Sequence, residues 1–276
     1  MDGNLFMEKM SDRVRKILSL YDEIKAGVNK SELRFNVSYI GVYWIADQFF
    51  CEKQVELYMK SGDVQTEKTK IGKNFHEGIS AGMEQANLEK IWCDILSGSR
   101  LYVSNMALVA KWKGVPIVGR SDLLLFSKGK PLWLFEFKFT NMRIPPDSSH
   151  VQARIYSLLL KLMGFNVSML KYAVVLSKDK LENFETWRRL VIDKVQKHIL
   201  FKEKAVVKID NCRAFIRKPN LDKAEKELDF ALGYWMNRRE AIPTKNASKC
   251  KSCAYITNCD SKLILNKSSS TSVNSD

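Results

Sequence analysis

The sequence predicts an α/β protein with a mixed sheet, and the order of its central elements leads to this prediction. Three strand-like runs are joined by two short Lys-Gly turns: residues 101–111, 115–126 and 131–139, with turns at Lys113-Gly114 and Lys128-Gly129. Strands joined by such short turns pair antiparallel. A helix predicted over residues 150–163 then leads to another strand at 171–176, and this crossover permits a parallel strand to join the sheet.

Further helices are expected before and after this central part. They cover residues 1–30, 38–60 with Ser38 as N-cap, 72–96, 181–200 and 221–241, with a strand between the last two. We therefore divide the chain into an N-terminal helical extension (1–36), one large domain (37–262) and a tail (263–276). The tail is rich in Ser and Asn and is expected to be disordered.

Composition limits the class of protein. Of the 276 residues 45% are hydrophobic, which is enough for a core, and the net charge of +14 favours a polyanionic partner, most commonly nucleic acid. No apolar run approaches the roughly 18 residues that a membrane span requires. The N-terminus lacks the apolar region of a signal peptide, so a cytoplasmic protein is expected.

Two charges interrupt an apolar strand at Leu132–Phe139, which reads LWLFEFKF. Side chains alternate between the faces of a strand, so Glu136 and Lys138 share one face. A buried charge is costly unless it is paired or bound to a metal. A simple ion pair on a half-exposed strand is the plain interpretation of Glu136 and Lys138 taken alone.

Asp122 gives this pair a further meaning, because it is a lone acid in the preceding strand. If the strands are neighbours, Asp122 and Glu136 lie close together and repel each other unless a cation lies between them. Carboxylate oxygens suit Mg²⁺ or Mn²⁺, which polarise a phosphate and activate a water for attack on phosphorus. Lys138 would position that water or neutralise the developing charge.

Three polar residues on helices fit the same site. Gln152 and Tyr156 are four apart, lie on one stripe of the helix after the strands, and are expected to flank the metal site. His76 follows Gly72 on the early helix, and an imidazole near two carboxylates would favour Mn²⁺. An ordinary surface pair and an ordinary surface histidine are the alternatives for these residues taken singly.

The ordered set resembles the motifs of RecB-type nucleases of the PD-(D/E)xK superfamily. It consists of Gly72…His76, Asp122, Glu136-Phe137-Lys138 and Gln152-x-x-x-Tyr156. The resemblance implies a restriction-endonuclease-like core in which His76, Asp122, Glu136 and the backbone carbonyl of Phe137 ligate Mg²⁺ or Mn²⁺. It also implies that Lys138, with Asp122 and Glu136, is catalytic, and that Gln152 and Tyr156 contact DNA.

The cysteines predict a second metal centre near the C-terminus. Cys250, Cys253 and Cys259 are spaced C-x2-C-x5-C, and a four-thiolate site requires one more ligand. A zinc ribbon normally has two CxxC pairs, and the sequence has no second pair. The fourth ligand therefore comes from a distant cysteine. The candidates are Cys51, Cys93 and Cys212.

One upstream cysteine with a C-terminal cysteine group resembles the iron–sulfur arrangement of RecB-type nucleases such as the AddB subunit and the Cas-four family of CRISPR-associated exonucleases. The resemblance covers roughly residues 36–262 and implies a [4Fe–4S] cluster on Cys51, Cys250, Cys253 and Cys259. A four-cysteine zinc site is the alternative. Cys93 and Cys212 are interpreted as ordinary core or surface residues.

The resulting hypothesis is a metal-dependent deoxyribonuclease. The resemblance implies an exonuclease acting on single-stranded or frayed DNA ends, in CRISPR spacer acquisition or DNA repair, with CRISPR integrase proteins as partners. The main alternative is a DNA-binding adaptor with little turnover of its own inside a larger complex. A third is a zinc-stabilised protein-interaction domain in which the Glu-x-Lys pair is incidental.

Overall fold

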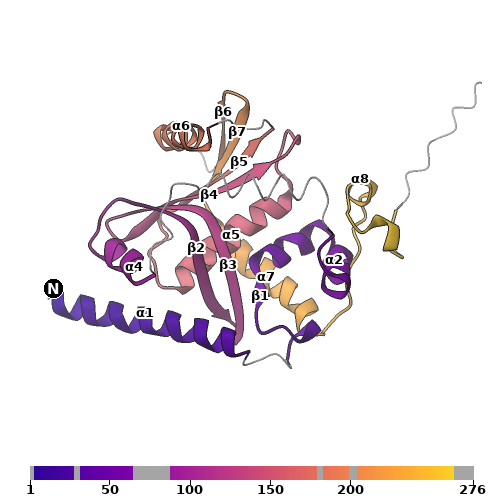
Figure 1. Cartoon of the computed structure of the whole chain (residues 1–276), viewed down its shortest axis with the longest axis horizontal. Coiled ribbons are helices and arrows are strands. Elements are labelled where there is room, and N and C mark those ends of the chain that lie inside the picture. Colours follow the sequence, from indigo (N-terminus) through magenta and orange to yellow (C-terminus); the bar gives the residue numbers. More distant parts are fainter. Residues whose placement is uncertain (1–2, 28–31, 65–87, 179–182, 199–203, 264–276) are drawn as a thin grey trace, which may run out of the picture.

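The computed structural model describes residues 3–27, 32–64, 88–178, 183–198 and 204–263 (Figure 1). Its helices are α1 (Gly3–Ala26), η1 (Arg34–Asn36), α2 (Val42–Ser61), α4 (Leu88–Leu96), α5 (Asp147–Leu162), α6 (Phe184–Lys197), α7 (Leu221–Trp235), α8 (Ala247–Lys251) and η2 (Ile256–Asn258). Its strands are β1 (Ile40–Gly41), β2 (Leu101–Trp112), β3 (Val115–Ser127), β4 (Lys130–Phe139), β5 (Lys171–Ser177), β6 (Lys204–Ile209) and β7 (Cys212–Arg217).

The strands form one mixed seven-stranded sheet, which confirms the predicted α/β class. The order is β1-β3-β4-β5-β7-β6, and β2 pairs along the length of β3. The β2–β3 and β3–β4 pairs are antiparallel, and β5 joins β4 in parallel after the crossover through α5. The central order of helix, three strands, helix and strand is the one that the sequence predicts.

Two Lys-Gly turns close the antiparallel strands, as predicted. The backbone φ is positive at both residues of each turn, at 49° and 86° for Lys113 and Gly114 and at 50° and 70° for Lys128 and Gly129. Two positive φ angles belong to the hairpin turn whose twist matches that of the flanking strands. Glycine adopts this conformation without steric cost, which explains its place in each turn.

Each face of the sheet is covered by its own hydrophobic core, and β4 contributes to both. Leu134 packs into the core on the face covered by α2, α5 and α7. Phe135 and Phe137 pack into the core beneath α6, where the Phe137 ring lies 5.6 Å from that of Trp187. By strand alternation, Glu136 and Lys138 share the α5 face with Leu134, as the sequence predicts.

Two predicted helix ends differ clearly from the structure. The second helix begins at Val42 after the short strand β1, so Ser38 is not its N-cap, and the residue before Val42, Gly41, has no side chain to cap with. The helix predicted to reach residue 241 ends at Trp235. Residues 72–87 of the third predicted helix, and residues 264–276 of the predicted tail, lie outside the described residues.

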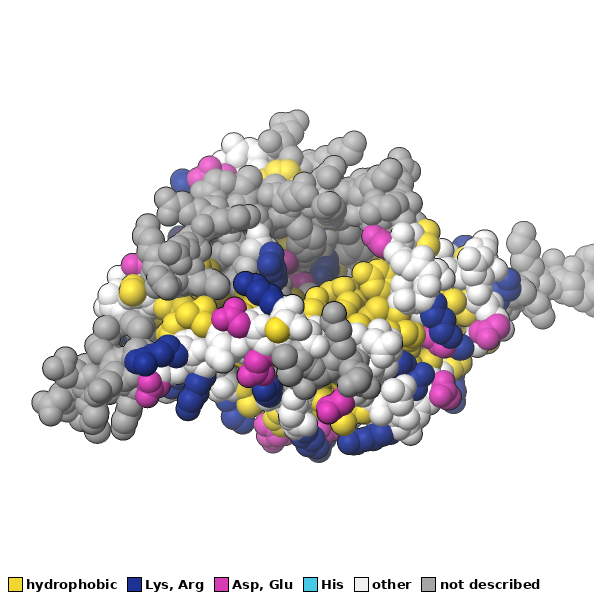
Figure 2. Space-filling view, turned by 60° about the horizontal axis from the view of Figure 1, so that its bottom comes forward, with side chains coloured by type: hydrophobic (Ala, Val, Ile, Leu, Met, Phe, Trp, Pro, Cys, Tyr) yellow, Lys and Arg dark blue, Asp and Glu magenta, His cyan; other side chains and the backbone are white. Residues whose placement is uncertain are grey.

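Charge is distributed over the surface without a single basic stripe on the face drawn in Figure 2. Lys and Arg side chains alternate there with Asp and Glu, and hydrophobic side chains gather between them (Figure 2). The basic residues behind the net charge of +14 are therefore not gathered into one stripe on this face. None of the described helices combines the length and the apolar character needed to cross a bilayer.

A buried ion pair joins α5 to α7 beneath the sheet. Arg154 donates from Nε to Glu227 at 2.8 Å and makes a second bond from its terminal nitrogen. The two residues are 4% and 7% exposed. Removing one member of such a pair leaves an uncompensated buried charge.

We expect Glu227→Ala to lower the free energy of unfolding by about 3–5 kcal/mol, since Arg154 would lose both bonds while remaining buried. Urea denaturation measures this. The control is Glu225→Ala, which removes an exposed partner of Lys161 on the same helix and should cost less than about 1 kcal/mol. Equal losses for the two variants would show that the buried pair does not join the helices as described.

Candidate functional site

The candidate site lies where β3 and β4 separate. The hydrogen-bonded ladder between β3 and β4 ends at Leu123 and Phe135. Earlier along the same edge of β3, Ile117 and Val118 pair with β1. Within the described part of the chain, no strand pairs with this edge at residues 119–122. The free edge therefore faces a gap between β1 and β4, and Asp122 lies at its end.

Asp122 bridges the two separating strands through its side chain. Its Oδ2 accepts a hydrogen bond from the backbone N–H of Phe137 at 2.7 Å. The N–H and C=O of one residue in an extended strand point to the same edge. The carbonyl of Phe137 is therefore directed toward the side of Asp122, so the structure brings together two of the predicted oxygen ligands.

Glu136 and Lys138 form an ion pair on the same face of β4. Lys138 Nζ lies 2.7 Å from Glu136 Oε1, and Glu136 is only 1% exposed. Burial alone would lower the pKa of Lys138, but the charges of Glu136 and Asp122 outweigh it and raise the pKa above its ordinary value. Lys138 is therefore a cation at neutral pH, placed beside two carboxylates.

A chain of hydrogen bonds from α5 fixes this lysine. Lys138 Nζ donates to Gln152 Oε1 at 3.1 Å, and Gln152 Nε2 donates to the hydroxyl of Tyr156, also at 3.1 Å. The Tyr156 hydroxyl in turn donates to the carbonyl of Arg120 at 2.7 Å. Gln152 and Tyr156 thus lie beside the carboxylates, as predicted. Their contact with DNA stays a prediction, and Tyr156 is only 2% exposed.

Gly119 makes room for Tyr156 against β3. A Cβ at this position would lie 2.5 Å from the Tyr156 ring and 2.8 Å from a methyl of Val42. Both are closer than real Cβ contacts, and both neighbours are buried and cannot move freely. The absence of a side chain at Gly119 is therefore what lets the α5 tyrosine reach the edge of β3.

Asp47 is a third acid at this site, and the sequence analysis missed it. It lies on α2, and its charge interacts with that of Lys138. Burial raises the pKa of Asp47 to about 6, and Lys138 opposes part of this rise. A usable signal was present, because Asp47 is the one acid in the apolar run VYWIADQFF.

His76, the remaining predicted metal ligand, lies outside the described residues. Within the described ranges, no three His, Cys, Asp or Glu side chains are arranged to hold a metal ion. Asp122, Glu136 and the Phe137 carbonyl nevertheless supply oxygen atoms of the type that Mg²⁺ and Mn²⁺ prefer. The donor set thus fits such an ion, with one predicted ligand not placed.

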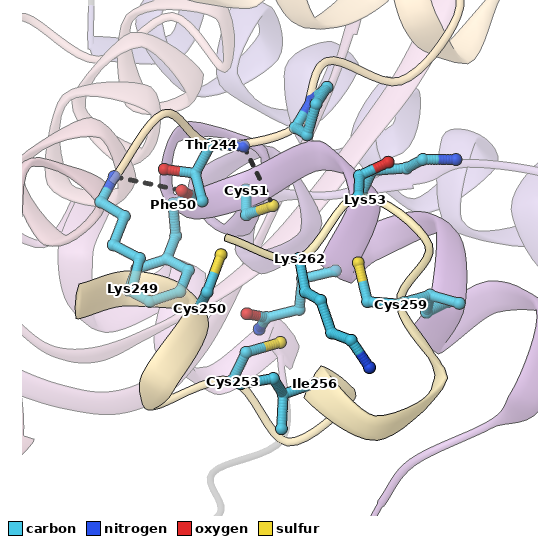
Figure 3. Close-up of a pocket in the computed structure, with 14 residues that line it drawn as sticks. Phe50, Cys51, Lys53, Thr244, Lys249, Cys250, Cys253, Ile256, Cys259 and Lys262 are labelled. Atoms are coloured by element: carbon cyan, nitrogen blue, oxygen red, sulfur yellow. Dashed lines mark hydrogen bonds between the residues drawn. The ribbon is translucent and has the colours of Figure 1, made fainter. Parts of the chain in front are cut away.

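The four cysteines of the predicted cluster line one pocket. Figure 3 shows Cys51 from α2 facing Cys250, Cys253 and Cys259 of the C-terminal segment. Burial raises the pKa of the Cys253 thiol, and the charges of the other three sulfurs raise it further. The other two cysteines lie elsewhere, Cys93 exposed and Cys212 buried, so of the three upstream candidates only Cys51 reaches the pocket.

A break in α2 turns Cys51 toward this pocket. The backbone at Cys51 is extended, with φ −168° and ψ 118°, so the helix consists of two segments that meet at a kink. Lys249 donates to the carbonyls of Phe49 and Phe50 at 3.2 and 3.1 Å, just before the kink. The N–H of Thr244 donates to Cys51 Sγ at 3.4 Å (Figure 3).

Glu52 fastens the same region to the segment after α7. This carboxylate is 2% exposed and accepts bonds from Arg239 Nη2 at 2.6 Å and from the N–H of Ile242 at 2.7 Å. It also accepts from Gln48 Nε2 at 3.1 Å. The chain that leads to Cys250, Cys253 and Cys259, here called the cysteine segment, is therefore held to α2 at its start. These polar contacts link residues about 190 apart in sequence.

Zinc and a four-iron cluster would require four thiolates at different separations. A tetrahedral zinc ion with bonds of about 2.3 Å draws its thiolates to about 3.7 Å from one another. Within the described part of the chain, no three of the cysteines are grouped for a single ion in this way. A four-iron cluster binds each thiolate through a different iron, so its ligands stand farther apart.

Asp47 gives a test of the electrostatics of the site in metal-free protein. Its folded pKa of about 6 lies above its ordinary 3.8, so the folded state holds a proton that the unfolded chain releases between these values. The contribution of Asp47 to the stability of the wild type should therefore fall as the pH rises from about 4 to 6. Asp47→Asn should lack this fall and gain up to about 3 kcal/mol over the wild type above pH 6.

Urea denaturation with a chelator, from pH 4 to pH 8, measures both curves. A difference between Asp47→Asn and wild type that does not grow between pH 4 and 6 would contradict the burial of this carboxyl.

Comparison with known proteins does not assign the chain to a family. No family model matches the sequence, and no curated protein matches it. Twelve chains of solved structures match, among them the crystal structure of SSO0001. The two chains are 16% identical, the match covers 82% of this chain and 88% of that chain, and the TM-score is 0.45. A TM-score this low says nothing about the activity of the chain.

Proposed function

We propose that this protein is a Mg²⁺- or Mn²⁺-dependent DNA nuclease of the RecB type in the PD-(D/E)xK superfamily. Its substrate is single-stranded or frayed DNA, which it shortens as an exonuclease. One observation carries the proposal: Asp122, Glu136 and Lys138 come together in the gap where β3 and β4 separate. The separation leaves an edge of β3 without a strand partner, and the Asp122 carboxylate reaches from that edge to the Phe137 N–H.

The chemistry of the gap suits phosphodiester hydrolysis. A divalent ion held by Asp122, Glu136 and the Phe137 carbonyl, with His76 as the further ligand, would polarise the phosphate and activate water. Asp122 holds the Phe137 backbone in place through the 2.7 Å bond. Because the Phe137 backbone is already fixed before the reaction, it needs little reorganisation during the reaction, which favours catalysis.

Lys138 supplies positive charge where a phosphate would gain negative charge. Its raised pKa keeps it charged at neutral pH, and Gln152 holds its ammonium group in position. A fixed cation beside a reacting phosphate stabilises the transition state more than a mobile one does. Folding has already ordered the fixed cation, so no further entropy is lost during the reaction. Gln152 thereby acts as a positioning residue for Lys138.

The cysteine pocket supports an iron–sulfur cluster as part of the same proposal. Cys51, Cys250, Cys253 and Cys259 would hold a [4Fe–4S] cluster, whose role is to join the C-terminal segment to α2. The pocket mixes these thiols with Phe50, Leu57 and Ile256, which would shield such a cluster from water. A four-cysteine zinc site is the competing assignment, and iron content distinguishes the two.

A DNA-binding adaptor is the second candidate, and one observation favours it. Lys138 already neutralises Glu136 at 2.7 Å, so the buried carboxylate has a partner without any metal. A domain of this kind would bind DNA inside a larger complex, such as one with CRISPR integrase proteins, and turn over little substrate alone. Cleavage by the purified chain decides between the two candidates.

The first test is cleavage of end-labelled single-stranded DNA with Mg²⁺ or Mn²⁺, using anaerobically purified protein. We expect wild type to cleave and Lys138→Ala to be slower by about 10²–10³-fold, since a fixed charge at the reacting phosphate is lost. Asp122→Ala and Glu136→Ala should lose both cleavage and Mn²⁺ binding, the latter followed by electron paramagnetic resonance.

Lys130→Ala is the matched control, because Lys130 lies on the same strand but is exposed at its other end. It should cleave at the wild-type rate. Wild-type cleavage by Lys138→Ala would refute the proposed centre. Absence of cleavage by folded, iron-loaded wild type would favour the adaptor.

The second test concerns the cluster. Cys51→Ser should lose most of the iron found in anaerobically purified wild type and should unfold at a lower temperature, because metal binding stabilises the folded state. Iron is measured chemically and unfolding by circular dichroism. Cys93→Ser, which changes an exposed cysteine outside the pocket, should match wild type. Zinc in place of iron in the wild type would favour the zinc site.

A further inference from the structure

We propose that the pocket lined by Tyr43, Asp47, Tyr58 and Tyr255 binds one unpaired nucleobase of the strand that enters the nuclease site. This inference rests on the proposed function and names how its substrate is held. The pocket has a volume of about 300 Å³, at the lower end of the range for small-ligand sites. A single nucleobase fits within this volume.

The pocket adjoins the proposed catalytic centre through Asp47. This aspartate lines the pocket, and its charge also interacts with that of Lys138. Tyr43 precedes Asp47 by one helical turn on α2 and lies on the same stripe. A strand whose phosphate lies beside Lys138 therefore brings a neighbouring base to the face of Tyr43.

Aromatic side chains provide the stacking surface. Tyr43 is 45% exposed, an unusual state for a large ring on an otherwise packed helix. Its ring is held in place by Trp44, with ring centroids 5.1 Å apart, and Tyr58 lines the same pocket. A fixed, exposed ring stacks on a base of any sequence, since every base has a π-face.

The charge of the pocket indicates a base and not a phosphate. Asp47 and Asp63 are its charged lining residues, and no Lys or Arg lines it in the described part of the chain. Two carboxylates repel a phosphate but accept hydrogen bonds from amino groups, as in the pairing of Asp with N4 of cytosine. Lys138, whose charge interacts with that of Asp47, would contact the phosphates instead.

Ala254 and Tyr255, which lie between Cys253 and Cys259, form part of the pocket wall. The Tyr255 hydroxyl donates to the carbonyl of Gly62 at 2.7 Å and accepts from the N–H of Val64 at 3.4 Å. Tyr255 lies between Cys253 and Cys259, so these bonds tie the end of α2 to the segment that carries the thiols. The width of the base pocket thus depends on the fold of the cysteine segment.

The test measures binding of a labelled 20-nucleotide oligodeoxycytidylate by fluorescence anisotropy, with Ca²⁺ replacing Mg²⁺ or Mn²⁺ to prevent cleavage. Tyr43→Ala in the full chain should weaken binding by about 5- to 150-fold, the range for loss of one base stack, and Tyr43→Phe should bind like wild type. For an oligonucleotide of the same length made only of abasic sites, Tyr43→Ala and wild type should bind equally.

Tyr102→Ala is the matched control. Tyr102 is 37% exposed on β2, where its hydroxyl accepts a bond from Gln196 of α6, on the sheet face opposite α5. This variant should bind the oligodeoxycytidylate like wild type. An equal loss for Tyr102→Ala, or a loss by Tyr43→Ala that persists on the abasic strand, would overturn the base pocket.

Cleavage separates this inference from the proposed function. If wild type cleaves single-stranded DNA and Tyr43→Ala binds it normally, the base pocket is wrong and the nuclease stands. If binding depends on Tyr43 and the abasic strand is bound equally, yet wild type does not cleave, the pocket stands and the proposed activity fails.

Discussion

The burial of Glu136 in a central strand is the constraint on which the site depends. An ionised carboxylate at 1% exposure costs several kcal/mol unless charges and hydrogen bonds compensate it. Lys138 supplies that compensation from two residues along the same strand, and α5 fixes the lysine through Gln152. The crossover helix must therefore lie close to β4, and Gly119 is what permits this closeness at the edge of β3.

The separation of β3 from β4 follows from the same region. Beyond Leu123 the two strands no longer share a ladder, and Asp122 replaces the lost backbone pairing with a side-chain bond to the Phe137 N–H. Because one oxygen of this carboxylate accepts the bond, the side chain holds the two strands together where their ladder ends. The sheet thus stays connected at the place where its edges are open.

The sequence predicts much of the fold because its central strands are regular. Alternation places Phe135 and Phe137 on one face and Glu136 and Lys138 on the other, and the structure has this arrangement. The Lys-Gly turns could also be predicted from the sequence, because their conformation favours glycine. By contrast, the start of α2 is set by β1, a two-residue strand whose partner is about 77 residues away in sequence.

Only part of the candidate site could be predicted from the sequence, for a related reason. Asp122, Glu136 and Lys138 stand out because charge interrupts apolar strands, whereas Asp47 belongs to a helix whose distance from Lys138 is decided by tertiary packing. No Pro or Gly in the sequence around Cys51 predicts the kink in α2. At the kink, Lys249 and Thr244 donate hydrogen bonds to α2. Interactions that span about 190–200 residues leave no periodic trace in the local sequence.

These long separations also impose an order on biosynthesis. Cys51 leaves the ribosome long before Lys262, the last residue lining the cysteine pocket. At about 5–20 residues per second, the pocket cannot close until roughly 10–40 s after Cys51 is made. During that interval the helix that carries Cys51 lacks Lys249 and Thr244. The final architecture of α2 is therefore a late event, completed only when the C-terminal segment arrives.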